Sequence, residues 1–546
     1  MKLDPKIQKF LKNVSLVNDE LEPVKLNKIQ LQDTNRILQK RFGYNQWDMG
    51  TGKTLTGMAQ IKYRLSTKQV DKVCVIGPSI AIDGTWDDAL RKNDIKAINV
   101  KSLADLNKGF GEKNDVLIFS HHYLGKYQRQ LKKFLKQHKI FLLVDEADEY
   151  SNPTSIRTKR ALAVFRRVAY KTLMSGTSVR NNIPEFYAQL ELLYNNTILM
   201  TDECPHHYTI NTKPKVAEVG AVLSKINTNK YKPFPAYRGF RHFKNAFNPS
   251  RASVFGVQKQ DQSIFNHEIL AGLIDYTVIT RSFKDITGRE IHTIHQDIIE
   301  ANAQEIEIET EVKKGVQQFY GRYIHSTGNS RKDAMLRLLH QMNLLFKVCA
   351  TPTSFDEYTL DTSSKYEKVK TYLDTTEEYV AIGGMHKEEM KLYRDWISRD
   401  YPEKKIFYID GNVNIKQRQA MTREIKATPN SVLISTVGAL KSSLNINFID
   451  KILVVSLPWN FSQLDQFQKR FVRYDSKNFK HIHYITLKGT IESNLIKLII
   501  DKDSLVSFMK TKTLDSSTNL NIDIGMIMSM VVEREELLNK TEKEAA

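Results

Sequence analysis

Short apolar runs alternate with helical periodicity through the first 200 residues. Leu55, Met58, Ile61 and Leu65 recur at three- to four-residue spacing, which predicts a helix over Thr54 to Leu65. The apolar runs have the length of strands that are buried on both faces: Val73 to Ile76, Val116 to Phe119, Ile140 to Val144 and Lys171 to Met174. This order is typical of a parallel sheet with crossover helices.

The same alternation returns between residues 379 and 498. Its predicted strands are Tyr379 to Ile382, Lys405 to Tyr408, Ser431 to Ser435, Ile452 to Val455 and His481 to Ile485. The pattern breaks over Thr201 to Pro249, which is rich in Lys, Asn, Tyr and Pro, and it becomes helical from Glu311 to Cys349. We therefore predict an α/β protein with two parallel-sheet lobes and helical insertions.

Composition narrows the class of partner. The 546-residue chain carries a net charge of +19, and its isoelectric point is near 9.4. A phosphate backbone is the commonest partner for such a surplus, although the charge can also serve solubility alone. Cys74, Cys204 and Cys349 lie far apart, which favours a reducing compartment over a disulfide framework. No apolar run approaches the ~20 residues of a membrane helix, and the charged N-terminus does not resemble a secretory signal, so we expect no membrane partner.

A glycine-rich segment, Asp48 to Thr54, comes directly before the predicted helix. Its glycines allow backbone N–H groups to approach phosphate oxygens, Lys53 would reach the β- and γ-phosphates of ATP, and the Thr54 hydroxyl would hold Mg²⁺. The usual signature has a further glycine where Trp47 stands, so the match is one position short. The predicted nucleotide-binding residues here are Gly50, Thr51, Gly52, Lys53 and Thr54.

A second candidate site follows the strand at Ile140 to Val144, where the sequence continues Asp145-Glu146-Ala147-Asp148. Asp145 would bind Mg²⁺ through water, and Glu146 would polarise the attacking water. An acidic loop after a strand is common, but ligands bind at the carboxyl ends of parallel strands. The glycine-rich segment Asp48 to Thr54, a phosphate-binding loop (P-loop), also precedes this quartet at a spacing that suits the same sheet. We predict Lys53, Asp145 and Glu146 as catalytic residues and Thr54 and Asp145 as metal ligands.

Further motifs follow in order, and together they resemble the Swi/Snf-like family of superfamily-two DNA-dependent ATPases. The resemblance runs from about Leu26 to Leu498. The segments that carry it are Leu26–Gln30, Pro78 with Trp86, Asp145–Asp148 with Asn152, Pro153 and Ser155, Ser175–Thr177 with Asn181 and Asn182, Arg281–Lys284, Lys347–Cys349 with Pro352, Ser435 and Thr436 with Leu444 and Asn445, and Trp459 and Asn460 with Gln466, Arg470 and Arg473.

The resemblance implies two RecA-like lobes and a role for each motif. Gln30 would read the adenine, Ser175–Thr177 would link hydrolysis to lobe movement, and Arg281–Lys284 would form a basic bridge between lobes. The implied domains are a first ATPase lobe at 1–200, its helical or loop insertion at 201–280, a bridge and helical insertion at 281–355, a second lobe at 356–500 and a helical tail at 501–546.

The last of these segments, Trp459 and Asn460 with Gln466, Arg470 and Arg473, resembles the sixth motif of the family, and its spacing has a physical reason. Gln466, Arg470 and Arg473 recur at helical spacing, so we expect them on one helix face. An arginine opposite the γ-phosphate stabilises transition-state charge, and we predict all three as catalytic, although a solvated basic face has the same pattern. The sequence departs from the family at Ala439–Ser443, where glycines are usual, at Ser178, where proline is usual, and at Tyr474–Ser476, where Ile-Gly-Gln is usual.

Two basic stretches are candidates for nucleic-acid contact. Lys225 to Lys244 interleaves basic and aromatic residues, but Phe240 and Phe243 would equally suit a structural loop that anchors helices. The second stretch is helical, and a solvated face is at least as good an interpretation. Its basic residues are Lys313, Lys314, Arg322, Arg331, Lys332 and Arg337.

We therefore expect an ATP- and Mg²⁺-dependent motor that moves on double-stranded DNA. Single-stranded DNA, RNA, and a protein partner in replication, repair or transcription stay open. Two other functions share these motifs: a strand-separating DNA or RNA helicase, and an ATP-gated factor that remodels a transcription complex. Trp459-Asn460 and Arg281–Lys284 favour the duplex motor. Short inserts suggest a compact bacterial or phage-encoded member, and hence a cytoplasmic location in the bacterium or the infected host.

Overall fold

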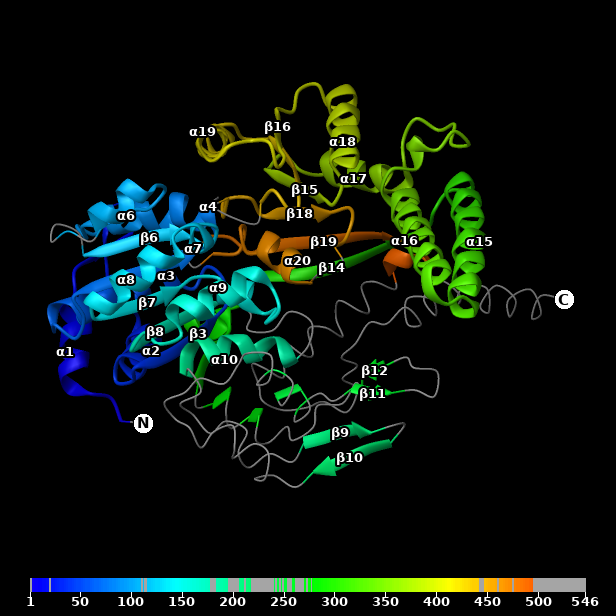
Figure 1. Cartoon of the computed structure of the whole chain (residues 1–546). Helices are drawn as coiled ribbons and strands as arrows, with labels where there is room; N and C mark the ends of the chain where they lie inside the picture. The colour runs from blue at the N-terminus through cyan, green and yellow to red at the C-terminus, as the bar shows by residue number, and fades with distance from the viewer. Residues whose placement is uncertain are drawn as a thin grey trace. The chain divides into compact units, whose positions relative to one another are not determined.

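The computed structural model of the chain divides into two compact units, with the boundary between Glu290 and Ile291 (Figure 1). The structure describes residues 2–18, 21–109, 111, 115–176, 183–194, 206–210, 213–217, 240, 243–244, 247, 250–252, 258–260, 270–271, 274–275, 277–440, 446–458, 461–473 and 476–493. Within these residues no helix is long and apolar enough to cross a membrane.

The first unit is built on a seven-stranded parallel sheet with the strand order β13-β3-β8-β7-β4-β6-β5. Its strands are β3 (Phe42–Trp47), β4 (Lys72–Gly77), β5 (Ala97–Asn99), β6 (Val116–Ser120), β7 (Ile140–Val144), β8 (Tyr170–Ser175) and β13 (Val278–Arg281). The strands predicted at β4, β6, β7 and β8 are confirmed. The sequence pattern did not predict β3, β5 or β13. Strand β3 carries buried polar residues, Asn45 and Gln46, which interrupt its apolar pattern.

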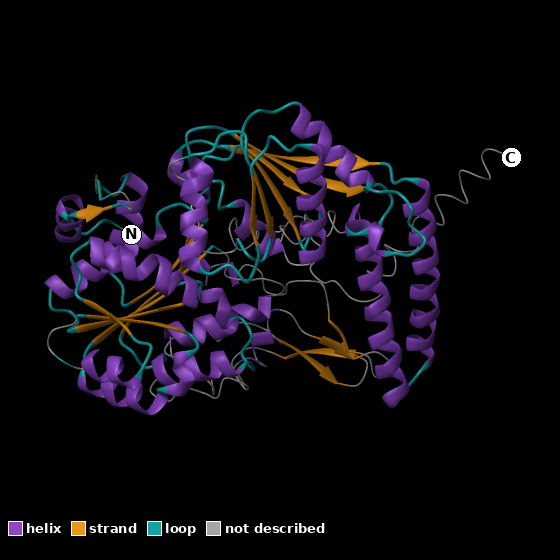
Figure 2. Cartoon of the chain, turned by 90° about the horizontal axis from the view of Figure 1, so that it is seen from above, coloured by secondary structure: helices purple, strands orange, loops and turns teal. Residues whose placement is uncertain are grey.

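Helices cover both faces of this sheet, which is why a central strand such as β7 is apolar throughout (Figure 2). In β7, Ile140, Leu142 and Val144 face one core, and Phe141 and Leu143 face the other. The helices of the unit are α1 (Pro5–Asn13), α2 (Lys28–Leu38), α3 (Lys53–Ser66), α4 (Ser79–Ala81), α5 (Asp87–Lys92), α6 (Leu103–Gly109), α7 (Tyr123–Lys126), α8 (Gln128–Gln137), α9 (Ile156–Phe165), α10 (Phe186–Tyr194) and α14 (Phe283–Thr287), with short helical turns η1 (Ile82–Trp86), η2 (Ala147–Tyr150) and η3 (Ile183–Glu185).

The edge strand β13 and helix α14 hold the segment 278–287 on the first unit, next to the P-loop strand β3. The Arg281 side chain makes a two-pronged ion pair with the fully buried Asp33, at 2.7 and 2.8 Å. The Asp48 N–H donates to the Arg281 carbonyl at 3.0 Å, and the Asp48 carboxylate accepts from the Phe283 N–H at 2.9 Å. The bridge segment thus lies inside the first unit, and the finer domain division stays a prediction.

Little of the region from 195 to 277 is described. The strand pairs β9 (His206–Ile210) with β10 (Lys213–Ala217) and β11 (Ser250–Ala252) with β12 (Gln258–Gln260) are antiparallel. The basic-aromatic stretch Lys225 to Lys244 lies mostly outside the described residues. At its end, Phe243 is buried and its ring centroid lies 5.7 Å from that of Tyr187, while Phe240 packs against the same core. These two phenylalanines therefore anchor the first unit, as the structural interpretation expected.

The second unit contains a six-stranded parallel sheet with the strand order β14-β19-β18-β15-β17-β16. The predicted strands are confirmed, and β14 was missed. The strands are β14 (His292–Ile299), β15 (Val380–Gly384), β16 (Ile406–Ile409), β17 (Val432–Thr436), β18 (Lys451–Val454) and β19 (Lys480–Leu487). The helices that follow the hairpin described below are α17 (Ser364–Asp374), α18 (Lys387–Asp400), α19 (Ile415–Lys426) and α20 (Phe461–Gln468), with the turn η4 (Pro352–Ser354) before them.

A helical hairpin lies between β14 and β15 in the sequence. Its helices, α15 (Ala303–His325) and α16 (Gly328–Ala350), lie side by side (Figures 1 and 2). Helix α15 begins at a capping box in which Asn302 and Glu305 exchange backbone and side-chain hydrogen bonds. The helical periodicity predicted from Glu311 to Cys349 is confirmed, with a break at Ser326 and Thr327. The tail predicted at 501–546 lies outside the described residues.

Candidate active site

The P-loop connects the carboxyl end of β3 to the start of α3. Gly50 and Gly52 have φ values of 75° and 86°, a left-handed conformation that side chains other than glycine rarely adopt. At Gly52 a Cβ atom would also lie 2.7 Å from the Gln30 Nε2 atom. No side chain caps α3, so the first N–H groups of this helix are available to an anion at the loop.

Two side chains of the loop itself hold it in shape. The Lys53 ammonium donates to the carbonyls of Trp47 and Asp48, at 2.7 and 3.2 Å. The Thr51 hydroxyl donates to the Asp48 carbonyl at 2.5 Å. The amine of Lys53 therefore lies over the loop, where it would exchange these carbonyls for phosphate oxygens when a nucleotide binds.

Gln30 supports the loop from helix α2. Its Nε2 atom donates to the Thr51 carbonyl at 2.9 Å, and its Oε1 atom accepts from the Asn27 N–H at 3.0 Å as part of a capping box. The side chain is 5% exposed. The structure thus gives Gln30 a positioning role that the sequence did not predict, and adenine reading stays a prediction.

Asp145 stands at the carboxyl end of β7, and its carboxylate is held by two donors. The Trp86 indole N–H donates to Oδ2 at 2.9 Å, and the Glu146 N–H donates to Oδ1 at 3.1 Å. Burial raises the pKa of Asp145, while the bond from Trp86 and the charge of Lys53 oppose that rise. The Trp86 ring also packs on α3, where a Cβ at Gly57 would lie 2.8 Å from it. Trp86 therefore joins the P-loop helix to the acidic motif.

Glu146 adopts a left-handed backbone conformation, with φ 49° and ψ 55°. Such a conformation costs a residue with a side chain roughly 1–3 kcal/mol and clusters at functional sites. Its neighbours on both sides hold this backbone conformation. The Asp145 N–H donates to the Ile76 carbonyl at 2.7 Å, and the turn η2 follows Glu146 directly. The strain falls on the residue predicted to position the attacking water.

Asp148, the last acid of the acidic motif, connects that motif to the third motif of the family, which is Ser175–Thr177 with Asn181 and Asn182. The Ser175 hydroxyl, at the end of β8, donates to the Asp148 carboxylate at 2.8 Å, and both residues are buried. Thr177, Asn181 and Asn182 lie outside the described residues. The part of the third motif that the structure describes is thus tied to the strand-end acids by a side-chain hydrogen bond.

A basic hollow of about 460 Å³ opens in the same unit. It is lined by Pro78, Ser79, His121, His122, Glu149, Ile156, Arg157 and Arg160. Of these residues, only Pro78 belongs to a motif predicted from the sequence. The signal that could have found the others is the polar Ser120-His121-His122 directly after a buried strand, since ligands gather at the carboxyl ends of parallel strands.

His121 and Tyr150 connect this hollow to the acidic motif. The His121 Nδ1 atom and the Tyr150 hydroxyl lie 2.5 Å apart, and Tyr150 ends the turn η2 that begins after Glu146. Burial and the charge of Arg157 lower the pKa of His121 to about 3, so the ring is neutral at physiological pH. Its Nε2 atom is buried and has no partner among the residues that the structure describes. Arg157 pairs with Glu149.

The sixth motif lies in the second unit, and one prediction about it was wrong. Helix α20 ends at Gln468, so Arg470 and Arg473 do not continue the helix face of Gln466. The chain turns there, with the N–H groups of Arg470 and Phe471 donating to the carbonyls of Phe467 and Gln468. Arg470 is 8% exposed. Trp459 and Asn460 lie outside the described residues, and the catalytic role of the two arginines stays a prediction.

The fifth motif of the family corresponds to Ser435 and Thr436 with Leu444 and Asn445, and it begins at the end of β17. Its turn is held by Arg418 of α19, whose guanidinium donates to the carbonyls of Val413, Asp410 and Ala439. Arg418 thus fixes the loop at the position where the resembling family usually has glycine. Leu444 and Asn445 lie outside the described residues.

The donors of the first unit suit a nucleoside triphosphate: backbone N–H groups at α3, the Lys53 ammonium, and the Thr54 hydroxyl. In the described residues no three His, Cys, Asp or Glu side chains are arranged to hold a metal by themselves. A Mg²⁺ ion would therefore depend on Thr54, Asp145 and the phosphates, which is its usual manner of binding. Fold and site define a P-loop nucleotide-binding protein with two parallel-sheet lobes.

Comparison with known families agrees with this class. Residues 46–354 match the family model of the SNF2-related domain, and residues 364–475 match the helicase conserved C-terminal domain. The first match alone covers more than half of the chain. The chain therefore belongs to the SNF2 family of helicase-like ATPases.

Individual relatives are distant. The chain is 21% identical over 460 residues to the SWI/SNF-related matrix-associated actin-dependent regulator of chromatin subfamily A-like protein 1 of Xenopus laevis, a match that covers 83% of this chain and 41% of the relative. It is 21% identical over 544 residues to nucleoside triphosphatase I of Heliothis armigera entomopoxvirus, covering 89% of this chain and 78% of the relative. The chain thus spans about two fifths of the length of the frog protein.

Among solved structures, the chain is similar to the SWI2/SNF2 ATPase core of Sulfolobus solfataricus in complex with double-stranded DNA. The identity is 16%, the match covers 94% of this chain and 96% of that chain, and the TM-score is 0.36.

Proposed function

We propose that this protein hydrolyses ATP with Mg²⁺ and uses the energy to move along double-stranded DNA without separating the strands. Membership of the SNF2 family supports the class of activity. Lys53 and the N–H groups of α3 bind the phosphates, Thr54 and Asp145 hold Mg²⁺, and Glu146 orients the attacking water. Arg470 and Arg473 contribute to transition-state stabilisation.

One observation supports the coupling of ATP to a polymer more than any other. The acidic motif continues without interruption into the turn η2, and residues of that turn reach the basic hollow. Tyr150 bonds to His121, and Glu149 pairs with Arg157. A change at Glu146 therefore has a short, fully described route to the lining of the hollow.

The hollow suits the phosphate backbone of a nucleic acid. Arg157 and Arg160 supply positive charge. Where the Tyr150 hydroxyl donates to His121 Nδ1, the neutral ring adds no charge to the hollow, so the two arginines would make the phosphate contacts. Contacts of this kind read no sequence, which suits a motor that steps along a backbone.

The proposal is tested by comparing ATP hydrolysis in the presence of duplex DNA, single-stranded DNA and RNA. Duplex DNA should stimulate most. The affinity for duplex DNA should fall steeply with salt, by about 0.9 log units per contact for each tenfold rise. Arg157→Ala with Arg160→Ala should lower this slope by about 1 to 2, the smaller loss applying where Glu149 already neutralises Arg157. Arg129→Ala on α8, which is exposed and not in the lining, should leave the slope unchanged.

Other outcomes of the same ATPase assay would support the alternative functions. Stimulation by single strands together with strand separation would replace the duplex motor by an unwinding helicase, and stimulation by RNA alone would make it an RNA enzyme. A salt-insensitive ATPase that no nucleic acid stimulates would favour an ATP-gated factor that remodels a transcription complex. A duplex motor of this kind would work in the cytoplasm of a bacterium or of a phage-infected host.

A further inference from the structure

The helical hairpin of the second unit has an uneven distribution of charge. Around its tip, residues 319–337, four arginine and lysine residues stand against one aspartate, a net charge of +3. Nearer the sheet, residues 303–318 and 338–350 hold four glutamates and three lysines, a net charge of −1. There Lys313 pairs with Glu309 at 3.0 Å and Lys314 pairs with Glu311 at 2.9 Å. Acidic residues thus offset the basic ones near the sheet, whereas basic residues outnumber acidic ones at the tip.

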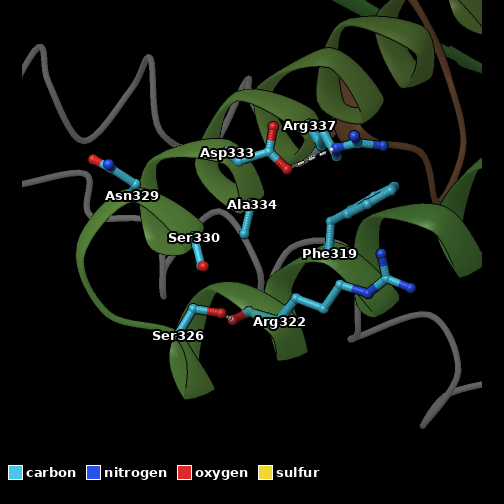
Figure 3. A pocket seen from close by; sticks show the side chains of 8 residues that line it. All are labelled: Phe319, Arg322, Ser326, Asn329, Ser330, Asp333, Ala334 and Arg337. Atoms are coloured by element: carbon cyan, nitrogen blue, oxygen red, sulfur yellow. Dashed lines mark hydrogen bonds and ion pairs between the residues drawn. The ribbon is translucent and has the colours of Figure 1, made fainter.

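Two arginines of the tip share one aromatic ring. The guanidinium carbons of Arg322 and Arg337 lie 5.2 and 5.9 Å from the centroid of Phe319. Figure 3 shows the Phe319 ring between the two side chains. Cation–π contact of this kind holds a guanidinium without neutralising its charge. Arg337 also pairs with Asp333 at 3.0 Å, whereas Arg322 has no carboxylate partner among the described residues.

A hollow of about 440 Å³ lies between the two helices at this tip. Besides Phe319 and the two arginines, its lining is polar and small: Ser326, Asn329, Ser330, Asp333 and Ala334 (Figure 3). Hydroxyl and amide groups next to fixed guanidinium groups are the set of donors that proteins use toward phosphodiester oxygens.

We propose that the hairpin tip, residues 319–337, binds the phosphate backbone of double-stranded DNA at a second place, separate from the hollow of the first unit. The inference rests on the proposed function in one respect, that duplex DNA is the ligand. Neither the nucleotide site nor the basic hollow contains any residue of the tip.

Two features favour DNA over an acidic protein surface. The arginines are held by an aromatic ring and bordered by hydroxyl and amide groups, which suits a repeated, uniform anion better than scattered carboxylates. The exposed apolar residues nearby, Leu336 and Leu339, are not in the lining of the hollow. A contact made only to phosphates would hold the hairpin on DNA without sequence preference.

The test is the salt dependence of duplex DNA binding by Arg322→Ala with Arg337→Ala. Each lost phosphate contact lowers the slope by about 0.9, so the double variant should lose about 1 to 2 from the wild-type slope. Arg322, which has no carboxylate partner among the described residues, should account for most of the loss, because Asp333 partly neutralises Arg337. ATP hydrolysis without DNA should not change. The matched control is Lys313→Ala with Lys314→Ala on the same hairpin, which removes two positive charges that carboxylates already neutralise and should keep nearly the wild-type slope.

A second variant tests whether the arginine substitutions act only by unfolding the hairpin. Phe319→Leu keeps both charges and removes the ring that holds them, so it should weaken DNA binding by a few-fold with the slope almost unchanged. A wild-type slope and affinity in both tip variants would overturn the proposal. If instead poly-glutamate competed with the tip while DNA binding stayed normal, the tip would be a protein-docking surface and the proposal would be wrong. If the wild-type protein bound no DNA, the proposed function itself would fail.

Discussion

The two units have parallel sheets of similar construction, but the carboxyl ends of their strands are used differently. In the first unit, polar side chains at these ends are each fixed by a hydrogen bond: Trp86 to Asp145, Gln30 to Thr51, and Ser175 to Asp148. Glycines at positive φ shape the loop before α3, whose first N–H groups have no side-chain cap. The first unit therefore presents a preorganised site.

In the second unit, the corresponding space is filled by the protein. A Cβ at Gly383 would overlap the Phe467 ring, and one at Gly384 would lie 2.6 Å from the Glu389 carboxylate. Behind these glycines, Lys365 pairs with Glu492 at 2.5 Å, and each side chain is 1% exposed. The Lys365 ammonium also donates to the Val455 carbonyl at 2.6 Å, and Ser456 donates to Glu389 at 2.6 Å.

The difference shows that the carboxyl ends of parallel strands can carry a catalytic site, but the residues placed there decide whether they do. Glycine serves opposite ends in the two units. At Gly50 and Gly52 it permits a loop shape that exposes backbone donors, and at Gly383 and Gly384 it permits closer packing. The first unit is expected to carry the hydrolytic groups, while the second contributes arginines from a tightly packed frame.

The largest effect is expected from the acids and the lysine of the first unit. Glu146→Gln should keep ATP binding and lower kcat by about 10²- to 10⁴-fold, because it removes only the carboxylate that positions water. Lys53→Ala should abolish tight ATP binding or turnover. Nucleotide affinity and DNA-stimulated hydrolysis, measured side by side, check both, with the exposed Glu377→Gln as control. Near-normal turnover of Glu146→Gln would mean that the hydrolytic site has been misassigned.

A smaller but still strong effect is expected from the second unit. Arg470→Ala and Arg473→Ala should each lower kcat by about 10²- to 10³-fold, with ATP affinity within a few-fold of wild type, since such an arginine acts mainly on the transition state. Arg473 should matter more. DNA binding without nucleotide should survive.

The neighbouring Lys469→Ala is the matched control for the two arginines, because Lys469 already pairs with Asp465 at 3.0 Å. Since Arg470 is buried, its variant also needs a melting temperature to separate catalysis from folding. Wild-type kcat in both arginine variants would leave the second unit without a catalytic part.

The smallest effect concerns protein stability, and it tests the buried side chains at the strand ends of the second unit. Burial raises the pKa of Glu389 to about 7 from a usual 4.5, with Lys365 opposing. The native state therefore holds this proton more tightly than the unfolded chain, and the stability from the neutral carboxyl is lost as pH rises from about 4.5 to 7. Glu389→Gln stays neutral, so it should be more stable than wild type by about 1–3 kcal/mol at pH 8 and nearly equal to it at pH 5.

Thermal unfolding at the two pH values measures this difference. Glu388→Gln is the control on the same helix, because the Glu388 side chain is 74% exposed. If Glu389→Gln were less stable than wild type at pH 8, the carboxylate would be charged and paired with Lys365, and the filled strand ends would hold a true ion network.

By itself, the sequence determined the elements that depend on local pattern. The strands at β4, β6, β7 and β8 are continuous apolar runs because both of their faces are buried, and the P-loop and the acidic quartet occupy fixed places at strand ends. The ordered series of motifs indicated the family that the domain matches bear out. These features need only neighbours along the chain, so a single sequence contains them.

The tertiary structure decided what depends on residues far apart in sequence. Trp86 bonds to Asp145, and Arg281 bonds to Asp33 across 248 positions. No periodicity encodes such pairs, because their geometry arises only when the sheet has formed. Helix α20 ends before Arg470 because the chain turns there, and the Arg470 carbonyl accepts a hydrogen bond from the Ile446 N–H, a residue far away in sequence. The buried strand β3 escaped prediction because Asn45 and Gln46 interrupt its apolar pattern, although the sheet buries both residues.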